Sequence, residues 1–232
     1  MTRLAVHRKL ALGTWRTSYD PAVYGDVEIR MDSALEYIAA FRRGTGKRLT
    51  VSHLFARAAA AALAEVPEAN AVLRWNRIYL RERIGVFFQI AIEAEGEEPD
   101  LSGATIYDAE KKSLHQICDE VDAKVAQVRA RNDPALEQAR MLFQRVPEWL
   151  MPETVRVLSF LHNTLNLDLS ALGVPNDPFG SVMITNIGSL GLEGAYAPLV
   201  PYSGVPFVLT LGAVKDAPIV HEGRGVSSSV SA

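Results

Sequence analysis

The chain has 232 residues, of which 48% are hydrophobic and 22% are charged, and its formal net charge at pH 7 is -3. This length suits one large domain or two small ones around a buried core, and the composition is that of an ordinary globular protein. The small negative charge gives no reason to expect a nucleic acid or an anionic membrane as partner. No stretch approaches the ~20 apolar residues of a membrane-spanning helix.

Cysteine usage and the N-terminus favour a cytoplasmic location. Cys118 is the single cysteine, so the chain forms no internal disulfide, as is typical of a reducing compartment. The first twelve residues carry Arg3, Arg8 and Lys9 but no long apolar run and no small-residue cleavage site. No signal peptide is therefore predicted.

The first predicted elements are a short strand and a helix. Residues Asp26 to Arg30 alternate in polarity as a strand does. Ser33 and Glu36 then form a capping-box pattern, in which each side chain satisfies an otherwise unpaired helix amide. Gly44 is predicted to end this helix.

A second helix is predicted from Thr50 to Val66, where Pro67 stops it. Its alanines allow close approach to a sheet, and its apolar stripe is predicted to comprise Val51, Leu54, Phe55, Ala58, Ala62 and Val66. His53 and Arg57 lie four residues apart on another face. They are interpreted as a partly exposed surface pair rather than a functional one.

Two strands are predicted next, from Arg74 to Glu82 and from Gly85 to Glu93, the second with both faces covered. A capping box formed by Ser113 and Gln116 opens a helix that extends to about Arg131. The apolar stripe of this helix contains Leu114, Ile117, Cys118, Val121, Val125 and Val128. Cys118 is accordingly predicted to be a core side chain and not a catalytic or redox group.

Residues 135–178 contain a long run of apolar side chains at largely helical spacing. One interpretation is a helical hairpin packed on the domain's own core. The other is a helix that binds a partner or a membrane surface, because large exposed apolar patches usually mark contacts. A turn at Asn176-Asp177-Pro178 leads back into the sheet.

The stretch from Phe179 to Val214 organises the chain. Residues 182–186 alternate as a strand, a loop with Gly188, Gly191 and Gly194 follows, and residues 207–211 make a second apolar strand. This pattern places the hydroxyl of Thr185 at the end of a strand, facing a glycine-rich loop.

The sequence Thr185-Asn186-Ile187-Gly188, followed by Ala197-Pro198 and the strand from Val208 to Val214, resembles the catalytic domain of dihydrolipoyl acyltransferases, the core subunits of 2-oxo acid dehydrogenase complexes. The resemblance covers most of the chain. Further motifs in the same order are Thr50-Val51-Ser52-His53-Leu54, Val66-Pro67-Glu68-Ala69-Asn70 and Asp108-Ala109-Glu110-Lys111-Lys112-Ser113-Leu114.

The resemblance implies a single α+β domain over residues 1–232, with a chloramphenicol acetyltransferase-like mixed sheet covered by helices. Residues 135–178 are an insertion relative to the family. The implied partner is two further copies of the chain, in a trimer with its active site between subunits. The basic segment from Val6 to Tyr24 is then either a solvated N-terminus or an arm that packs across subunits.

The implied activity is coenzyme A-dependent acyl transfer to a dihydrolipoyl thiol or to a small hydroxyl compound. The family's oxyanion donor falls on Thr185, with Asn186 and Gly188 as substrate-binding residues that shape its surroundings. Acyl-coenzyme A is a substrate, and the resemblance implies neither a metal nor a lipoyl group bound covalently to this chain. The chain lacks the lipoyl and subunit-binding domains that usually precede this domain, which favours a stand-alone relative.

The family's general base, a histidine in a His-x-x-x-Asp-Gly motif near the C-terminus, is absent from this sequence. His221 precedes Glu222-Gly223 but is followed by no such motif, and His115 heads a His-x-x-x-Asp match inside a predicted helix. His7 and His162 have no carboxylate at useful local spacing.

Two interpretations follow from the missing motif. Either the chain is a truncated acyltransferase whose tail at 225–232 is foreign to the fold, or it is a catalytically inactive trimeric scaffold or binding module that has lost the base. The serine-rich tail favours truncation. Other reaction classes leave no motif: the sequence has no Gly-x-Ser-x-Gly elbow, no phosphate loop with its lysine and no His-Glu-x-x-His helix.

Overall fold

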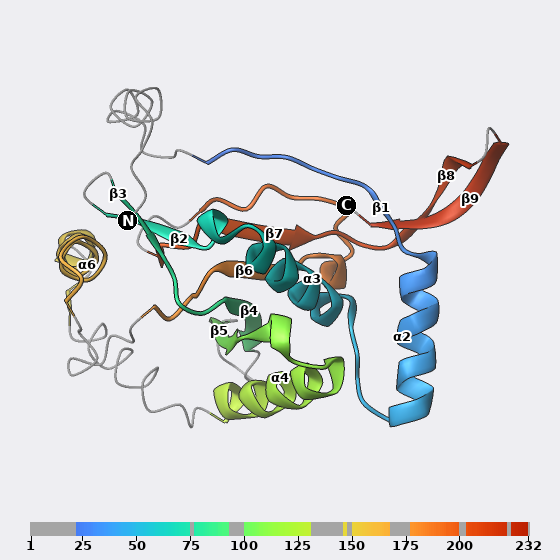
Figure 1. Cartoon of the computed structure of the whole chain (residues 1–232), viewed down its shortest axis with the longest axis horizontal. Helices are drawn as coiled ribbons and strands as arrows, with labels where there is room; N and C mark the ends of the chain where they lie inside the picture. The colour runs from blue at the N-terminus through green and yellow to red at the C-terminus, as the bar shows by residue number, and fades with distance from the viewer. Residues whose placement is uncertain are drawn as a thin grey trace.

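The computed structural model describes residues 22–74, 77–92, 100–130, 146–147, 150–167, 177–199, 203–221 and 224–231. Figure 1 shows their arrangement. The α-helices are α2 (Asp32–Thr45), α3 (Val51–Glu65), α4 (Leu114–Arg129) and α6 (Met151–Ser159). The short helical turns are η2 (Pro67–Ala69), η3 (Ala109–Lys111), η5 (Phe160–Thr164) and η7 (Gly188–Leu190). The strands are β1 (Ile29–Arg30), β2 (Ala71–Arg74), β3 (Arg77–Leu80), β4 (Gly85–Ile92), β5 (Asp100–Tyr107), β6 (Val182–Asn186), β7 (Phe207–Leu211), β8 (Lys215–His221) and β9 (Arg224–Ser231).

The main sheet has the strand order β5-β4-β6-β7. Strands β4 and β5 are antiparallel, whereas β4, β6 and β7 are parallel to one another, so the sheet is mixed. The predicted strands at 182–186 and 207–211 are confirmed as β6 and β7. Parallel pairing brings their carboxyl ends to the same edge of the sheet.

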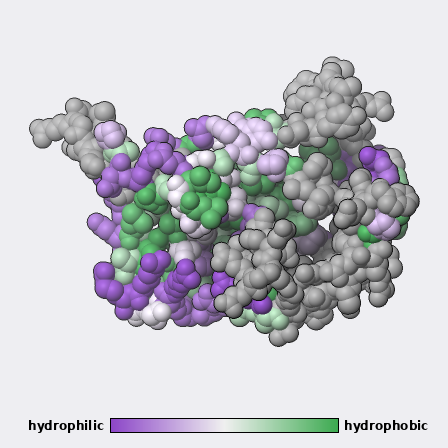
Figure 2. Space-filling view, turned by 180° about the vertical axis from the view of Figure 1, so that it is seen from behind, coloured by the Kyte–Doolittle hydropathy of each residue, from purple (hydrophilic) through white to green (hydrophobic). Residues whose placement is uncertain are grey.

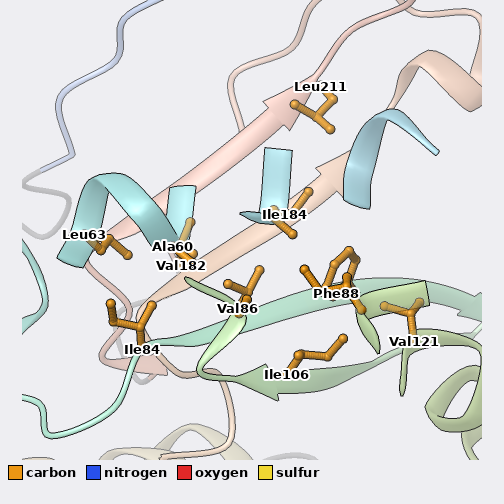
Figure 3. Close-up of a cluster of buried hydrophobic side chains, with 13 residues drawn as sticks. Ala60, Leu63, Ile84, Val86, Phe88, Ile106, Val121, Val182, Ile184 and Leu211 are labelled. Atoms are coloured by element: carbon orange, nitrogen blue, oxygen red, sulfur yellow. The ribbon is translucent and has the colours of Figure 1, made fainter. Parts of the chain in front are cut away.

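Helices α3 and α4 pack on one face of this sheet (Figure 1). Figure 3 shows the resulting core, to which α3 contributes Ala60 and Leu63, α4 contributes Val121, and the sheet contributes Val86 and Ile184 among others. Ala56 and Ala60 of α3 are fully buried, because a methyl side chain allows the helix axis to approach the strands closely.

The bounds predicted for α3 are confirmed, and the predicted apolar stripe is right in its first half only, where Val51, Leu54 and Phe55 pack against the core. Ala58, Ala62 and Val66 are exposed, and the buried residues of the helix are His53, Ala56, Ala60 and Leu63. An alanine-rich helix has little contrast in hydropathy between its faces, so periodicity alone does not identify the buried one.

Helix α2 begins and ends differently from the prediction. Its N-cap is Met31, which makes no side-chain cap, so the predicted Ser33 capping box is wrong. Asp32 stands instead in the first turn, where a carboxylate interacts favourably with the helix dipole, and it pairs with Arg30 at 2.6 Å. The helix continues past Gly44 and ends at Gly46, whose φ of 70° suits glycine.

Helix α4 follows the prediction closely. The backbone N–H of Ser113 donates to Gln116 Oε1 at 2.8 Å, and the N–H of Gln116 donates to Ser113 Oγ at 3.3 Å, which confirms the capping box. Cys118 is fully buried, as predicted, and burial raises the pKa of its thiol. Such a thiol is held in its neutral, unreactive form.

The region between α3 and α4 was only partly predicted. The single strand expected from Arg74 to Glu82 is a hairpin of β2 and β3, and the strand expected from Gly85 is confirmed as β4. Strand β5 was missed, although it pairs with β4 along eight residues. Its Gly103 lies beneath the ring of Phe87, which a Cβ at that position would meet at 2.1 Å.

Within the predicted insertion, the structure describes α6 and η5. Exposed apolar side chains in this region include Leu150, which is the N-cap of α6, Val157 and Phe160. Arg74 of β2 hydrogen-bonds to Asn166 just beyond η5. Both interpretations of residues 135–178 therefore stay open.

Strands β8 and β9 form an antiparallel hairpin, and β1 pairs with β9 through Ile29 and Arg30 (Figure 1). Residues 225–231 of the predicted foreign tail belong to β9. In this strand, Gly225 to Val230 pair with β8, from Val220 back to Lys215, and Ser231 pairs with Ile29 of β1. The predicted basic arm lies outside the described residues, except for its last three.

Large apolar side chains on the described surface include Val23, Leu190 and Tyr196, which are 89%, 75% and 67% exposed. The ring of Tyr24 meets that of Tyr196 edge-on at 5.5 Å, so the segment before β1 contacts the loop before β7. Seen from behind, apolar side chains appear between polar ones over the middle of the molecule (Figure 2).

Candidate active site

Thr185, the predicted oxyanion donor, is the fourth residue of β6 and is half-buried. Its neighbours Val182 and Ile184 point toward α3 and belong to the core, so Thr185 and Met183 face the other side of the sheet. The prediction that a threonine stands at the end of a strand before a glycine loop is confirmed.

A second threonine stands beside it. Strands β6 and β7 pair so that Thr185 is the Cα partner of Thr210, and Met183 is the partner of Val208. Paired residues of neighbouring strands share one face, and parallel strands lie roughly 4.8 Å apart. The two threonines therefore lie side by side on one face, near the carboxyl ends of β6 and β7.

Asn186 connects this edge of the sheet to α3 and to the glycine loop. Its Nδ2 donates to Ser52 Oγ at 3.2 Å, and its Oδ1 accepts from the backbone N–H of Ser189 at 3.2 Å. Ser189 Oγ in turn donates to the carbonyl of Asn186 at 2.8 Å. Both ends of the Asn186 amide thus hold neighbouring segments in place.

Gly188 begins η7 where the loop passes against the end of β7. A Cβ at this position would lie 2.6 Å from the carbonyl oxygen of Gly212 and 2.8 Å from the Cα of Ala213. Gly191 ends the turn with a φ of 77°. Gly188 must therefore lack a side chain because the backbone at the end of β7 lies against it, and Gly191 must be glycine because of its positive φ.

The N-terminus of α3 adds a capping box that sequence reasoning missed. Thr50 is the N-cap, and its backbone N–H donates to His53 Nδ1 at 3.0 Å. His53 is 5% exposed, so the interpretation of His53 as a partly exposed surface residue is wrong. Threonine followed three residues later by a side chain able to accept a hydrogen bond was the available signal.

Burial lowers the pKa of His53 because the charged imidazolium is desolvated. The carboxylate of Asp122 on α4 acts in the opposite direction, whereas Arg48 and Arg42 lower the pKa further. Since the Thr50 N–H donates to Nδ1, that nitrogen carries a free lone pair and the neutral ring bears its hydrogen on Nε2. His53 therefore serves as a neutral helix cap.

Among the remaining histidines, the structure describes the side chain of His115 alone. His115 is exposed on α4 and its ring lies 4.6 Å from that of Phe41. His221 ends β8, His162 lies in η5, and His7 falls outside the described residues.

Among the residues that the structure describes, no group of three or more His, Cys, Asp or Glu side chains is placed to hold a metal ion. In the same part of the chain, no helix is long and apolar enough to cross a membrane.

Comparison with known structures identifies the fold. The chain matches a probable dihydrolipoamide acetyltransferase from Listeria monocytogenes with a TM-score of 0.62 at 16% identity, covering 100% of this chain and 82% of that one. It matches the cubic core of a pyruvate dehydrogenase multienzyme complex with a TM-score of 0.63 at 16% identity, covering 100% and 80%. The expected α+β fold with a mixed sheet covered by helices is therefore confirmed.

A third match is the dihydrolipoamide acetyltransferase of Azotobacter vinelandii, studied for the role of a serine, a histidine and an asparagine in its catalytic mechanism. Its TM-score is 0.62 at 16% identity, covering 100% of this chain and 80% of that one. No curated protein matches the sequence.

The sequence itself supplies the family. Residues 8–138, more than half of the chain, match the catalytic domain of the 2-oxoacid dehydrogenases acyltransferase family. This match lies upstream of β6 and is independent of the motif at Thr185, while the fold agrees over the whole chain. The chain belongs to the 2-oxoacid dehydrogenases acyltransferase (catalytic domain) family.

Proposed function

We propose that this protein transfers an acyl group between coenzyme A and a thiol acceptor of the dihydrolipoyl type. Membership of the acyltransferase family is the observation that carries the proposal. The position of Thr185 supports it, since a half-buried hydroxyl at the end of β6 is available to a reacting carbonyl.

The proposed reaction joins the acceptor sulfur to the thioester carbonyl carbon. The acceptor thiol loses its proton to a base, and its sulfur attacks the carbonyl to give a tetrahedral intermediate with a negatively charged oxygen. The bond from carbon to the coenzyme A sulfur then breaks, and the released thiolate takes up a proton. The products are the acylated acceptor and free coenzyme A.

Thr185 is proposed to donate its hydroxyl hydrogen to the oxyanion of that intermediate. Such a donor acts where charge develops and typically changes kcat by a factor of about 100 to 1,000. Asn186 and Gly188 are proposed to shape the site. The two hydrogen bonds of the Asn186 amide and the close approach of Gly188 to Gly212 support this role.

We further propose that the protein is a homotrimer formed from single domains, that coenzyme A enters as a substrate, and that the protein acts in the cytoplasm. The matched cubic core of a pyruvate dehydrogenase complex is a precedent for assembly in this fold. Sedimentation equilibrium measures the number of copies, and a monomer at micromolar concentration would contradict the trimer.

The second candidate is a catalytically inactive scaffold or binding module with the same fold. The observation that favours it is the absence of a His-x-x-x-Asp-Gly motif from the 232 residues. A third candidate is an acyltransferase that uses a small hydroxyl compound, and not a thiol, as its acceptor.

The test is turnover of acetyl-coenzyme A with dihydrolipoamide and with a panel of small alcohols, using both this chain and a version read to the natural stop codon. Transfer to dihydrolipoamide by either form supports the proposal. Transfer to an alcohol alone favours the third candidate, and no transfer by either form favours the scaffold. Binding of coenzyme A, measured by calorimetry, separates an inactive site from an absent one.

A further inference from the structure

The outward side of α6 has no role in the function proposed above. Leu150, Val157 and Phe160 are 39%, 54% and 49% exposed, and their spacing of seven and three residues puts them on one side of the helix. Glu153, whose side chain is 57% exposed, stands between Leu150 and Val157 on the same side. These four residues, the outer stripe of α6, have the spacing of the contact positions of a coiled coil.

The outer stripe is separate from the side of the segment that is partly covered. Leu158 and Leu161 are half-buried, and the exposed side of such a helix is usually polar. The match to the acyltransferase family ends at residue 138, before α6 begins, so that match gives the stripe no role. Apolar residues at coiled-coil spacing on an exposed side are the pattern by which two helices pair.

The charges of this segment indicate the kind of partner. Together, α6 and η5 contain one acidic and one basic residue, Glu153 and Arg156, whose ion pair of 2.6 Å is exposed at both ends. A helix that lies on a membrane surface typically carries several Lys and Arg side chains on its polar side. This segment has one arginine and no net charge, so it fits an apolar protein surface that carries one charge of each sign.

A second copy of α6 has that pattern when it runs in the opposite direction. The acidic residue precedes the basic one, so an antiparallel pair centred between residues 154 and 155 puts Glu153 of each copy opposite Arg156 of the other. The same arrangement puts Leu150 of each copy beside Phe160 of the other. A two-fold contact uses the same patch on both copies, and the outer stripe is complementary to itself in this way.

We propose that α6 is a contact surface for a second copy of this chain, with the two helices paired antiparallel through their outer stripes. The contact is two-fold, so it differs from the three-fold contact of the proposed homotrimer, and it does not depend on acyl transfer. A helix of nine residues gives a small interface, and small interfaces form weak, concentration-dependent contacts.

Charge reversal tests the proposal by sedimentation velocity on a concentration series of the full chain. Glu153→Arg and Arg156→Glu each bring like charges together between the copies, so each should raise the Kd of two-fold association by about tenfold or more. In an equimolar mixture of the two variants, opposite charges meet again between copies, while each chain keeps its own like-charged pair. The mixture should therefore associate with a Kd within about threefold of that of the unaltered protein.

Two further variants test the apolar part of the stripe. The double variant Val157→Glu with Phe160→Glu should abolish two-fold association, because it places charges in the contact. The matched control is Tyr37→Glu, which changes a side chain that is 49% exposed on α2, at the other end of the molecule from α6 (Figure 1), and should leave association unchanged. Far-UV circular dichroism of each variant checks that its helices are kept.

Three results would overturn the inference. Equal sedimentation of the unaltered protein and the Val157→Glu, Phe160→Glu variant at every concentration excludes the contact. A mixture of the two charge variants that associates no better than either variant alone excludes the antiparallel pairing. If the double variant instead loses binding to vesicles of phosphatidylcholine and phosphatidylserine with no change in self-association, the outer stripe is a membrane-binding surface. The acyl transfer assay is independent of all three results, so the proposed function can stand where this inference fails.

Discussion

The guanidinium of Arg81 donates two hydrogen bonds, of 2.9 and 3.2 Å, to the carboxylate of Asp177. The two residues lie 96 positions apart in the sequence. Arg81 also donates to the carbonyls of Ala71 at 3.1 Å and Gly204 at 3.0 Å. Its side chain is 7% exposed. One buried arginine thus holds together the β2–β3 hairpin, the turn before β6 and the loop before β7.

Arg81→Leu is expected to lower the free energy of unfolding by about 3 kcal/mol, because it leaves a carboxylate and two carbonyls without their donor. Urea denaturation measures this loss. The matched control is Arg156→Leu, which removes an exposed ion pair with Glu153 and should cost about 0.5 kcal/mol or less. Equal losses in the free energy of unfolding for the two substitutions would show that the buried contacts of Arg81 do not stabilise the fold more than an exposed ion pair does.

The glycine loop offers three substitutions that separate crowding from backbone strain. Gly188→Ala should destabilise by about 2 kcal/mol, because its Cβ would meet backbone atoms of Gly212 and Ala213. Gly191→Ala should cost about 1 kcal/mol through its φ of 77° alone, since it has open space around it. Gly194→Ala meets neither obstacle and should change stability by less than about 0.5 kcal/mol. Thermal unfolding of the three variants would contradict this order if Gly194→Ala were the least stable.

The contact between Asn186 and Ser52 should be measurable as a coupling energy. Ser52→Ala and Asn186→Ala each remove the 3.2 Å hydrogen bond between α3 and β6, so the double variant should lose less stability than the sum of the two. A coupling of about 0.5 to 1 kcal/mol is expected for one hydrogen bond. Asn186→Ala should also speed hydrogen exchange at the Ser189 amide, whose acceptor it removes. Zero coupling would mean that the two segments are held together by other contacts.

Stability should fall on mild acidification because of His53. Burial lowers the pKa of this histidine in the folded protein below its ordinary value of about 6.5. Above pH 6.5 the ring is neutral in both states, and its full contribution to stability is present. As the pH falls below that value, the unfolded chain binds a proton that the folded protein does not, so the free energy of unfolding decreases.

Urea denaturation at pH 7.5 and pH 5.5 measures this slope. His53→Gln keeps a hydrogen-bond acceptor at the third position of the helix and should flatten the slope. Thr50→Ala weakens the same cap without removing the imidazole, so it should lower stability at both pH values and keep the slope. An unchanged slope in His53→Gln would assign the pH dependence to other groups.

The sequence predicts those parts of the fold whose signals are local. The capping box at Ser113, the proline after α3 and the alternation of β6 are each complete within a few residues, and the structure has them as predicted. Strand β5 was missed because its pairing with β4, eight residues away or more, makes its weak strand pattern stable. The second half of the buried face of α3 was misjudged because alanine occupies both faces there.

Motif order locates Thr185 in the sequence, but it does not reveal the neighbours of that residue. Thr210 lies 25 residues further along the chain, and only the parallel register of β6 and β7 makes it the partner of Thr185. The contact from Asn186 to Ser52 likewise depends on how α3 lies over the sheet. Contacts between distant segments depend on tertiary structure, which local sequence patterns do not supply.

The central claim is that Thr185 stabilises the oxyanion in an acyl transfer from coenzyme A. The most direct measurement is kcat for acetyl transfer to dihydrolipoamide in the unaltered protein and in Thr185→Val, with coenzyme A binding measured on both. We predict that kcat falls by a factor of about 100 to 1,000 while binding is unchanged. Equal kcat in the two proteins would contradict the role of Thr185. Binding of coenzyme A without turnover in any form of the protein would contradict the proposal that it is an acyltransferase.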